Sequence, residues 1–422
     1  MQVMAPPYLH RYIDRELDEI LPDAAAVAID GAKGVGKTAT ASRRADEVLA
    51  LDSPETRQLV EADTVRQITR AATVCLDEWQ HYPPVWDAVR RQVDSHASTR
   101  FILTGSAGLP AGTDTHSGAG RILSLRMRPL SVPERGTVTP TVLLSELFDS
   151  NGQASVTGRT EVDLEGYADM ICSTGFPGIV GLTGRLRRSQ VEGYISRVID
   201  RDIADSGILV RKPGALRAWW TAYAAASSTA ANYTTILDAA TAGDAEKISK
   251  DAALSYRELL TQLWILDPVP AWTPALLPFK RLTTTPKHQV VDPGIAAALL
   301  GVTPQILTSG SAGSGELFGQ LLESLLTLTV RVAGQAAEAK TYHLRTRGGE
   351  REVDLILERY DGKIIALEVK LSPVVRDDDV KHLHWLGNQL GDRLAEKIIV
   401  TTGHEAFRRA DGVAVVPLAL LG

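Results

Sequence analysis

Short apolar runs alternate with charged, helix-like stretches through the first third of the chain. Apolar runs of about four to eight residues bounded by turn residues are typical of buried strands, and intervening helices favour a parallel sheet covered on both faces. The pattern predicts an α/β domain over residues 1–140, with a Gly- and Ser-rich surface loop at 105–120. The expected strands are Val27–Ile29, Val48–Leu51, Thr73–Leu76 and Phe101–Leu103, and a helix, Thr38–Glu47, follows the first of them.

Residues 141–308 carry a different pattern, mostly helical and rich in alanine. The stretch 215–231 and the amphipathic stretch Ile248–Leu263 predict helices, and two short strand-like runs follow at Trp264–Leu266 and His288–Val291. Helices followed by a small hairpin indicate a winged-helix-like region.

The last region, residues 309–422, opens with Ser309–Gly315, a segment with the composition of a flexible linker. A long helix and two alternating strands, Glu352–Leu357 and Ile364–Lys370, come next, with a turn at Tyr360–Gly362 between the strands. A further helix and a last strand, Lys397–Thr401, complete the pattern. The sequence therefore predicts a compact third domain of α/β type.

The composition agrees with ordinary globular domains. The 422 residues allow three domains of about 150 residues each, and 44% apolar with 23% charged residues is close to average usage. Forty-five basic and 51 acidic residues leave a net charge of −6, which excludes a histone-like polycation but permits a local basic groove. Cys75 and Cys172 are the two cysteines, too few for a disulfide framework or a zinc cluster.

Neither the N-terminal segment nor any apolar run has the pattern of a targeting or membrane segment. Met1–Glu19 lacks an apolar core before a small-residue cleavage site, and the chain has no run of 18 apolar residues. We expect a cytoplasmic protein with no membrane partner.

A phosphate-binding motif follows the first predicted strand. The pattern G-x-x-x-x-G-K-[ST] needs glycines because backbone N–H groups must close around phosphate oxygens, and it leads into a helix N-terminus that favours anions. Lys37 is expected to contact the β and γ phosphates of ATP, and the Thr38 hydroxyl to hold Mg²⁺. The nucleotide-binding residues are predicted to be Gly31, Ala32, Lys33, Gly34, Val35, Gly36, Lys37 and Thr38.

Two adjacent carboxylates end the strand Thr73–Leu76. In a phosphate-loop ATPase, Asp77 would order the Mg²⁺ ion and Glu78 would act catalytically by polarising the attacking water. The competing interpretation is a helix-capping Asp beside a solvated Glu.

Polar and basic residues after the next strand are candidates for sensing the γ-phosphate. Thr104 and Ser106 stand at the end of that strand, although a hydroxyl that closes a tight turn would account for either. Arg121, Arg126 and Arg128 could complete the site in cis or from a neighbouring copy, and surface charge is the alternative for each.

Charged residues also gather in the two strands of the third region. Glu368 and Lys370 project from the same strand face, and the short turn brings Asp354 alongside. With Glu323 on the preceding helix, the carboxylates Asp354 and Glu368 suit Mg²⁺ or Mn²⁺ as ligands, and Lys370 would act catalytically on a water for phosphodiester attack. A solvated hairpin face is the competing interpretation.

These motifs together resemble a known family. The phosphate loop, the Leu-Asp-Glu strand and the Leu-Thr-Gly-Ser segment resemble AAA+-type ATPases of the additional-strand-Glu division. The chain is similar, from about residue 8 to residue 403, to a prokaryotic AAA+-type ATP-binding family whose C-terminal domain of unknown function contains a PD-(D/E)xK nuclease-like core. Further matching segments are Gly120–Arg121, Arg128–Ser131, Gly175–Pro177, Tyr194, Arg201–Ile203, Val291–Gly294, Gly319–Glu323, Glu352–Asp354 and Glu368–Lys370.

The resemblance implies an N-terminal P-loop ATPase domain with a parallel sheet, a winged-helix region, and a C-terminal α/β restriction-endonuclease-like domain. From it and the motifs we expect a Mg²⁺-dependent ATPase coupled to a nuclease-like domain that acts on DNA or RNA. The alternative is a nucleotide-dependent regulatory switch whose C-terminal domain is a non-cleaving binding or assembly module. An arginine supplied in trans would add self-association.

Overall fold

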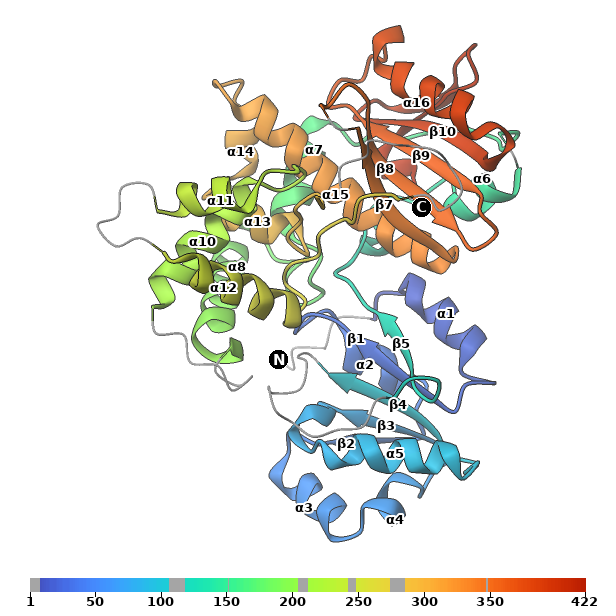
Figure 1. Ribbon diagram of the computed structural model, residues 1–422, viewed down its shortest axis with the longest axis vertical. Coiled ribbons are helices and arrows are strands. Elements are labelled where there is room, and N and C mark those ends of the chain that lie inside the picture. The colour runs from blue at the N-terminus through green and yellow to red at the C-terminus, as the bar shows by residue number, and fades with distance from the viewer. Residues whose placement is uncertain are drawn as a thin grey trace.

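The computed structural model describes residues 8–105, 118–150, 152–203, 212–241, 248–273, 285–346 and 348–422. Two sheets lie at opposite ends of the molecule, and green to orange helices of the middle of the chain pack beside the C-terminal sheet (Figure 1). The long orange helix α15 (Ser314–Ala336) crosses between these helices and the C-terminal sheet (Figure 1).

The N-terminal sheet is parallel throughout, in the order β2-β3-β4-β1-β5. The predicted α/β fold with a parallel sheet is thus confirmed. Its strands are β1 (Ala26–Asp30), β2 (Glu47–Ala50), β3 (Thr73–Asp77), β4 (Arg100–Gly105) and β5 (Leu123–Arg126). Its helices are α1 (Tyr12–Ile20), α2 (Lys37–Ser42), α3 (Pro54–Ala62), α4 (Thr64–Ile68) and α5 (Pro84–Asp94), with a 3₁₀ turn at Trp79–His81.

Two details of this domain differ from the prediction. The helix expected over Thr38–Glu47 ends at Ser42, because Glu47 already belongs to β2. The strand β5 was not predicted: its burial pattern is half exposed, so its sequence lacks the continuous apolar run of a central strand.

Alternate residues of the central strands serve two different cores. Val27 and Ile29 of β1 join the large core that continues through the middle helices and α15, whereas Ala28 faces a second core under α5. On β4, Ile102 faces the first core and Phe101 the second. Because successive side chains of a strand point to opposite faces, both faces of the sheet are buried. Polar groups are then placed at the ends of the strands.

The middle region is helical, as predicted, but its strand-like runs form only isolated bridges. Leu266 pairs with Val290 and Val269 with Lys287, both antiparallel; we call residues 265–269 and 287–291 the ribbon. The connection at 274–284 lies outside the described residues, so the winged-helix interpretation stays a prediction. The helices are α6 (Leu144–Ser150), α7 (Leu164–Ser173), α8 (Gly184–Arg197), a π turn (Val198–Asp202), α10 (Pro213–Ala225), α11 (Tyr233–Ala240), α12 (Lys250–Gln262), α13 (Pro293–Leu299) and α14 (Pro304–Leu307).

The C-terminal sheet is mixed, in the order β6-β11-β12-β10-β9-β8-β7. Its edge strand β6 (Gly158–Arg159) comes from the stretch that the sequence assigns to the middle region. Lys397–Thr401 is not the last strand, because β11 and β12 follow it, and the expected linker Ser309–Gly315 gives way to α15 at Ser314. The other elements are β7 (Ala339–Arg345), β8 (Glu352–Arg359), β9 (Ile364–Val369), α16 (Asp377–Leu390), β10 (Leu394–Thr401), β11 (Glu405–Arg408) and β12 (Ala414–Pro417).

Backbone hydrogen bonds tie the end of the chain to the start of the middle region. The N–H groups of Thr141 and Val142 donate to the Leu420 carbonyl, each at 3.0 Å, and the Gly422 N–H donates to the Val142 carbonyl at 2.9 Å. Together with the continuous large core, these bonds join the middle region and the C-terminal sheet. Within the described ranges, no helix is long and apolar enough to cross a membrane.

Candidate functional site

The loop between β1 and α2 has the backbone that its sequence predicts. Gly34 and Gly36 adopt φ values of +83° and +104°, which side chains with a Cβ rarely tolerate. A Cβ on Gly31 would lie 2.2 Å from the Met127 carbonyl oxygen, so the backbone that follows β5 packs directly against the loop. The glycines of the motif therefore serve two purposes here, the curvature of the loop and its close packing.

Lys37 lies inside this loop. Its ammonium donates to the carbonyl oxygens of Gly31 at 2.8 Å and Ala32 at 3.0 Å, and the residue is only 5% exposed. Burial lowers the pKa of Lys37 to about 8, although the Glu78 carboxylate opposes this shift. A buried ammonium that donates to neutral carbonyl oxygens favours a negatively charged ligand nearby, and a phosphate would supply that charge.

The carboxyl ends of two neighbouring strands bring the next polar groups together. β3 and β4 pair in a register that places Asp77 beside Thr104. Asp77 Oδ1 accepts hydrogen bonds from the Thr104 hydroxyl and, at 2.8 Å, from the Thr38 hydroxyl. A hydroxyl and a carboxylate beside the loop suit Mg²⁺, which is commonly bound through one or two carboxylates together with substrate phosphates and water. The donor set thus fits the predicted ion.

Glu78 follows β3 in a left-handed conformation with φ of +50°. Its carboxylate accepts a hydrogen bond from the Gln80 side-chain amide. Gln80 was not predicted as a site residue, and a Cβ on Gly105 would lie 2.8 Å from its Oε1 atom. The glycine at the end of β4 therefore leaves room for the side chain that contacts Glu78.

The candidate arginines are separated by the structure. Arg121 pairs with Asp94 at 2.9 Å, at the end of α5 and largely exposed. Arg126 is half-buried in register with Asp30 at the end of β1, and its guanidinium lies 3.8 Å from the ring centroid of Trp264. Burial lowers the pKa of Arg126 to about 9, against the opposing charge of Asp267.

Arg128 points to the ribbon. Its Nε donates to an Asp267 carboxylate oxygen at 2.7 Å, and a second guanidinium, that of Arg331, lies 3.3 Å from the other oxygen. Of the three arginines, Arg126 therefore lies nearest the end of the phosphate strand. Ser106, the other hydroxyl candidate, lies outside the described residues.

A pocket of about 230 Å³ lies beside the loop and is lined partly by the middle region. Tyr194 of α8 donates to the Lys33 carbonyl at 3.1 Å, and its ring lies 4.7 Å from that of Phe176. Lys33 itself pairs with Asp202 at 2.9 Å. These residues come from the segments Gly175–Pro177, Tyr194 and Arg201–Ile203, which the sequence singled out without assigning them a role.

The second predicted constellation also assembles. Asp354 lies on β8, Glu368 on β9, and Lys370 directly after β9, while Glu323 reaches them from α15. The Asp354 carboxylate accepts a hydrogen bond from the Val369 N–H at 3.0 Å, and Lys370 lies 3.9 Å from Glu368. Burial and the nearby Asp354 raise the pKa of Glu368 well above its ordinary value, with Lys370 opposing.

Lys287, which was not predicted, occupies the middle of this group. Its ammonium lies 2.7 Å from a Glu323 oxygen, 3.1 Å from an Asp354 oxygen and 3.7 Å from Glu352. Among the described residues, no group of three or more His, Cys, Asp or Glu side chains is arranged to hold a metal ion. The carboxylates as placed do not fit a divalent metal, because an ammonium already lies between them.

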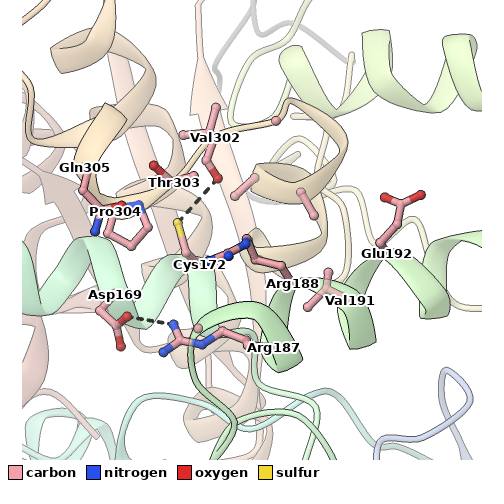
Figure 2. Close-up of a pocket in the computed structure, with 15 residues that line it drawn as sticks. Asp169, Cys172, Arg187, Arg188, Val191, Glu192, Val302, Thr303, Pro304 and Gln305 are labelled. Carbon is pink, nitrogen blue, oxygen red and sulfur yellow. Dashed lines mark hydrogen bonds and ion pairs between the residues drawn. The ribbon is translucent and has the colours of Figure 1, made fainter.

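A larger pocket of about 380 Å³ opens between α7, α8 and the end of α13 (Figure 2). Arg187 pairs with Asp169 at 2.7 Å across one side, and the Cys172 thiol faces the Val302 carbonyl oxygen at 3.9 Å (Figure 2). Burial raises the pKa of Cys172 to about 12, which favours the protonated thiol over the nucleophilic thiolate at neutral pH. None of the predicted site residues lines this pocket.

Family models match three successive parts of the chain. Residues 23–135 match an AAA domain, residues 164–306 a domain of unknown function (DUF8612), and residues 318–421 another domain of unknown function (DUF4143). The matches support an AAA-type ATPase that carries a C-terminal domain of unknown function.

The chain is similar to two proteins described as uncharacterized, Rv2008c of Mycobacterium tuberculosis and Mb2031c of Mycobacterium bovis. Each is 24% identical to this chain over 349 residues, which is 82% of this chain and 68% of the relative. A solved structure titled "Structure of Drosophila ORC bound to DNA" aligns with 60% of this chain and 86% of its own, at 14% identity and a TM-score of 0.25.

Proposed function

We propose that the protein hydrolyses ATP in a Mg²⁺-dependent reaction at the loop between β1 and α2. The observation that carries the proposal is the convergence of three groups from two elements: the Lys37 ammonium and the Thr38 hydroxyl at the start of α2, and the Asp77 carboxylate at the end of β3. A buried cation beside a hydroxyl and a carboxylate is what a nucleoside triphosphate with Mg²⁺ requires. The AAA-domain match over residues 23–135 supports the same function.

Each side chain has a defined part in this proposal. Lys37 binds the β and γ phosphates, while Thr38 and Asp77 would hold Mg²⁺, which neutralises phosphate charge when bound. Glu78 accepts a proton from the attacking water, and Thr104 fixes the Asp77 carboxylate through its hydrogen bond. Arg126 is the candidate for charge stabilisation in cis.

The test is an ATPase assay on the full chain with Mg²⁺ present and absent. Lys37→Ala should abolish ATP binding, and Glu78→Gln should bind ATP but lose turnover. Lys340→Ala, which removes an exposed lysine of β7, is the matched control and should behave as wild type. Unchanged nucleotide affinity in Lys37→Ala would refute the phosphate-loop assignment.

A second candidate function concerns the C-terminal domain, which could cleave DNA or RNA with Mg²⁺ or Mn²⁺. The support is the placement of Asp354 and Glu368 on adjacent strands beside Lys370, with Glu323 close by. Such an activity requires Lys287 to leave the carboxylates. A cleavage screen with both metals tests it, and Asp354→Asn and Lys370→Ala should abolish cleavage without changing the ATPase rate.

The alternative is a nucleotide-dependent switch whose C-terminal domain binds or assembles without cleaving. The ion pairs of Lys287 favour this alternative, because they fill the place of a catalytic metal with a protein cation. Absence of cleavage on any nucleic acid, together with normal ATPase activity, would support the switch. Nucleic-acid binding that weakens steeply with salt would show phosphate contacts in either case.

Self-association is part of the proposal only if an arginine enters the site from a second copy. Arg121 is a candidate for that role, since its side chain is 45% exposed. Sedimentation with a slowly hydrolysed ATP analogue should then show a larger species, and Arg121→Ala should lower the ATPase rate without lowering ATP affinity.

A further inference from the structure

Lys287 is a buried lysine surrounded by carboxylates of another part of the chain. The residue is 2% exposed, and its ammonium lies within 3.1 Å of both a Glu323 oxygen and an Asp354 oxygen. Glu352 lies further away, at 3.7 Å. Burying an ammonium is costly unless close anions compensate it, so this position depends on those carboxylates.

The middle region holds the backbone of this lysine in place. Lys287 and Val269 exchange two backbone hydrogen bonds of 2.9 Å, which form one rung of the ribbon. The next residue, His288, lies between Tyr223 and Tyr233, with each ring centroid 4.9 Å away. The lysine therefore enters the cluster from outside the C-terminal sheet, at a fixed point.

The carboxylates belong to α15 and to the C-terminal sheet. Glu323 is on α15, and the hydroxyl of the next residue, Ser324, donates to the Gln289 side chain at 2.8 Å, so two adjacent residues of α15 contact the ribbon. Asp354 is on β8 and also accepts from the Val369 N–H. The ion pairs of Lys287 thus connect the ribbon to two elements at once.

The remaining charges near the cluster are also compensated by the protein. Arg345 lies 3.6 Å from Glu352, and Lys370 lies 3.9 Å from both Glu368 and Asp379. Burial and Asp354 favour the neutral form of Glu368. Burial and the charge of Lys287 lower the pKa of His343 to about 4, so that histidine is neutral and adds no further positive charge.

We propose that Lys287 is the resident cation of the C-terminal carboxylate cluster, in place of a divalent metal, and that the cluster is a charge-paired joint that fastens the ribbon to α15 and β8. The proposal is independent of ATP hydrolysis at the phosphate loop. It decides between the two candidates for the C-terminal domain, since a joint with a protein cation does not assemble a metal-dependent nuclease site.

The decisive measurement is Mn²⁺ binding by the full chain without nucleotide, followed by the electron paramagnetic resonance of free Mn²⁺. Every protein in the series carries Thr38→Ala, so that any metal binding beside the phosphate loop is weakened equally in all of them. With Lys287 present, we expect no binding up to about 1 mM Mn²⁺. Lys287→Met should create a Mn²⁺ site, because it leaves the carboxylates without a cation, and adding Asp354→Asn should remove that site.

Thermal unfolding supplies a second readout. Lys287→Met should lower the Tm by roughly 10 °C, since it leaves buried carboxylates unpaired, and Mn²⁺ should restore part of the loss. Lys287→Arg keeps the positive charge, so it should lower the Tm by less than Lys287→Met does, and it should not bind Mn²⁺. Lys340→Met, the control at an exposed lysine of β7, should change neither Tm nor metal binding.

Two results would overturn the proposal. One is Mn²⁺ binding well below 1 mM by the chain with Lys287 intact, lost on Asp354→Asn, which would assign the cluster to a metal. The other is Lys287→Met with an unchanged Tm and no gain of Mn²⁺ binding. If Lys287→Met does not fold, the Mn²⁺ titrations of the proteins with Lys287 and with Lys287→Arg still show whether the carboxylate cluster binds a metal while a protein cation is present. A wild-type chain that does not hydrolyse ATP, together with the expected Mn²⁺ results, would count against the proposed function and not against the joint.

Discussion

Arg128 and Asp267 form an ion pair of 2.7 Å that joins the backbone after β5 to the ribbon. Arg331 of α15 reaches the same carboxylate at 3.3 Å, so one aspartate connects the N-terminal domain, the ribbon and α15. Burial would raise the pKa of Asp267, but the guanidinium groups of Arg128 and Arg331 hold it well below the usual range. The ion pair therefore stabilises the folded protein at any pH above the ordinary pKa of an aspartate. This stabilisation is lost as the pH falls through the lowered pKa of Asp267.

Arg128→Ala should destabilise the protein by about 3 kcal/mol, because it removes one partner of an ion pair whose side chains are only 10% and 15% exposed. The exposed pair of Arg121 and Asp94 provides a matched control, and Arg121→Ala should cost at most about 0.5 kcal/mol. Urea unfolding of both variants measures the difference. Equal losses in the two variants would contradict the structural distinction between these arginines.

Gly31→Ala should weaken ATP binding by roughly 100-fold, about 2.7 kcal/mol, because its Cβ would overlap the Met127 carbonyl oxygen and displace the loop. A glycine of α8 supplies the control: a Cβ on Gly193 has no neighbour within 4 Å. Gly193→Ala should bind ATP as wild type does. Titration with a fluorescent ATP analogue compares the two, and full affinity in Gly31→Ala would show that the loop tolerates the added methyl group.

The arrangement of the candidate phosphate-binding residues could be predicted because its determinants are local or follow from the parallel sheet. Gly31–Thr38 is one continuous segment of the chain, and Asp77 and Thr104 lie at the ends of neighbouring strands, so the contact between Asp77 and Thr104 follows from the strand order. Asp354 and Glu368 could likewise be paired through the short turn between β8 and β9.

The features that were missed depend on contacts between distant segments. Lys287 is 36 residues from Glu323 and 67 from Asp354, and no spacing rule marks a lysine beside a weak strand as their partner. β6 was missed for the same reason, because its two residues become a strand only by pairing with β11. Tyr194 and Asp202 reach Lys33 from the middle helices, a contact that no periodicity in the sequence reveals.

ATP affinity should fall by about tenfold per pH unit above pH 8. The reason is that burial lowers the pKa of Lys37 to about 8, whereas phosphate binding needs the protonated ammonium. Binding at pH 9 should then take up one proton, which calorimetry in two buffers of different ionisation enthalpy measures.

Lys37→Arg is the matched variant, since arginine stays charged over this range and its residual affinity should not vary with pH. The lowered pKa of Lys37 also makes the free energy of unfolding rise with pH between pH 8 and about 10.4. In this range Lys37 is protonated in the unfolded chain but not in the folded one. Wild-type affinity that is constant from pH 7 to 9.5 would contradict a lowered pKa of Lys37.

Thr104→Val should lower kcat about tenfold with little change in KM. It removes one of the two hydroxyl groups that donate to Asp77, a loss of about 1.5 kcal/mol for a hydrogen bond to a charged group. Thr104→Ser keeps the hydroxyl and should recover most of the rate. Steady-state ATPase kinetics separates the two parameters, and equal rates for Val and Ser would assign Thr104 a packing role only.

Gln80→Leu should also reduce kcat about tenfold, by removing the amide that holds the Glu78 carboxylate. Glu78 stands at a left-handed backbone position directly after β3, and the Gln80 amide contacts its carboxylate there. Gln80→Glu provides the sharper comparison: a second carboxylate beside Glu78 should raise the pKa of the base and move the acid limb of the kcat profile to higher pH.

A purely structural role for Gln80 would change stability without moving that limb. The control is Gln67→Leu on α4, which should leave both the rate and the pH profile unchanged. If Gln80→Leu and Gln80→Glu have wild-type kcat while Glu78→Gln is inactive, Glu78 is the base but holds its position without Gln80. If all three lose turnover and only Gln80→Glu shifts the profile, the amide acts through the Glu78 carboxylate, as its hydrogen bond indicates.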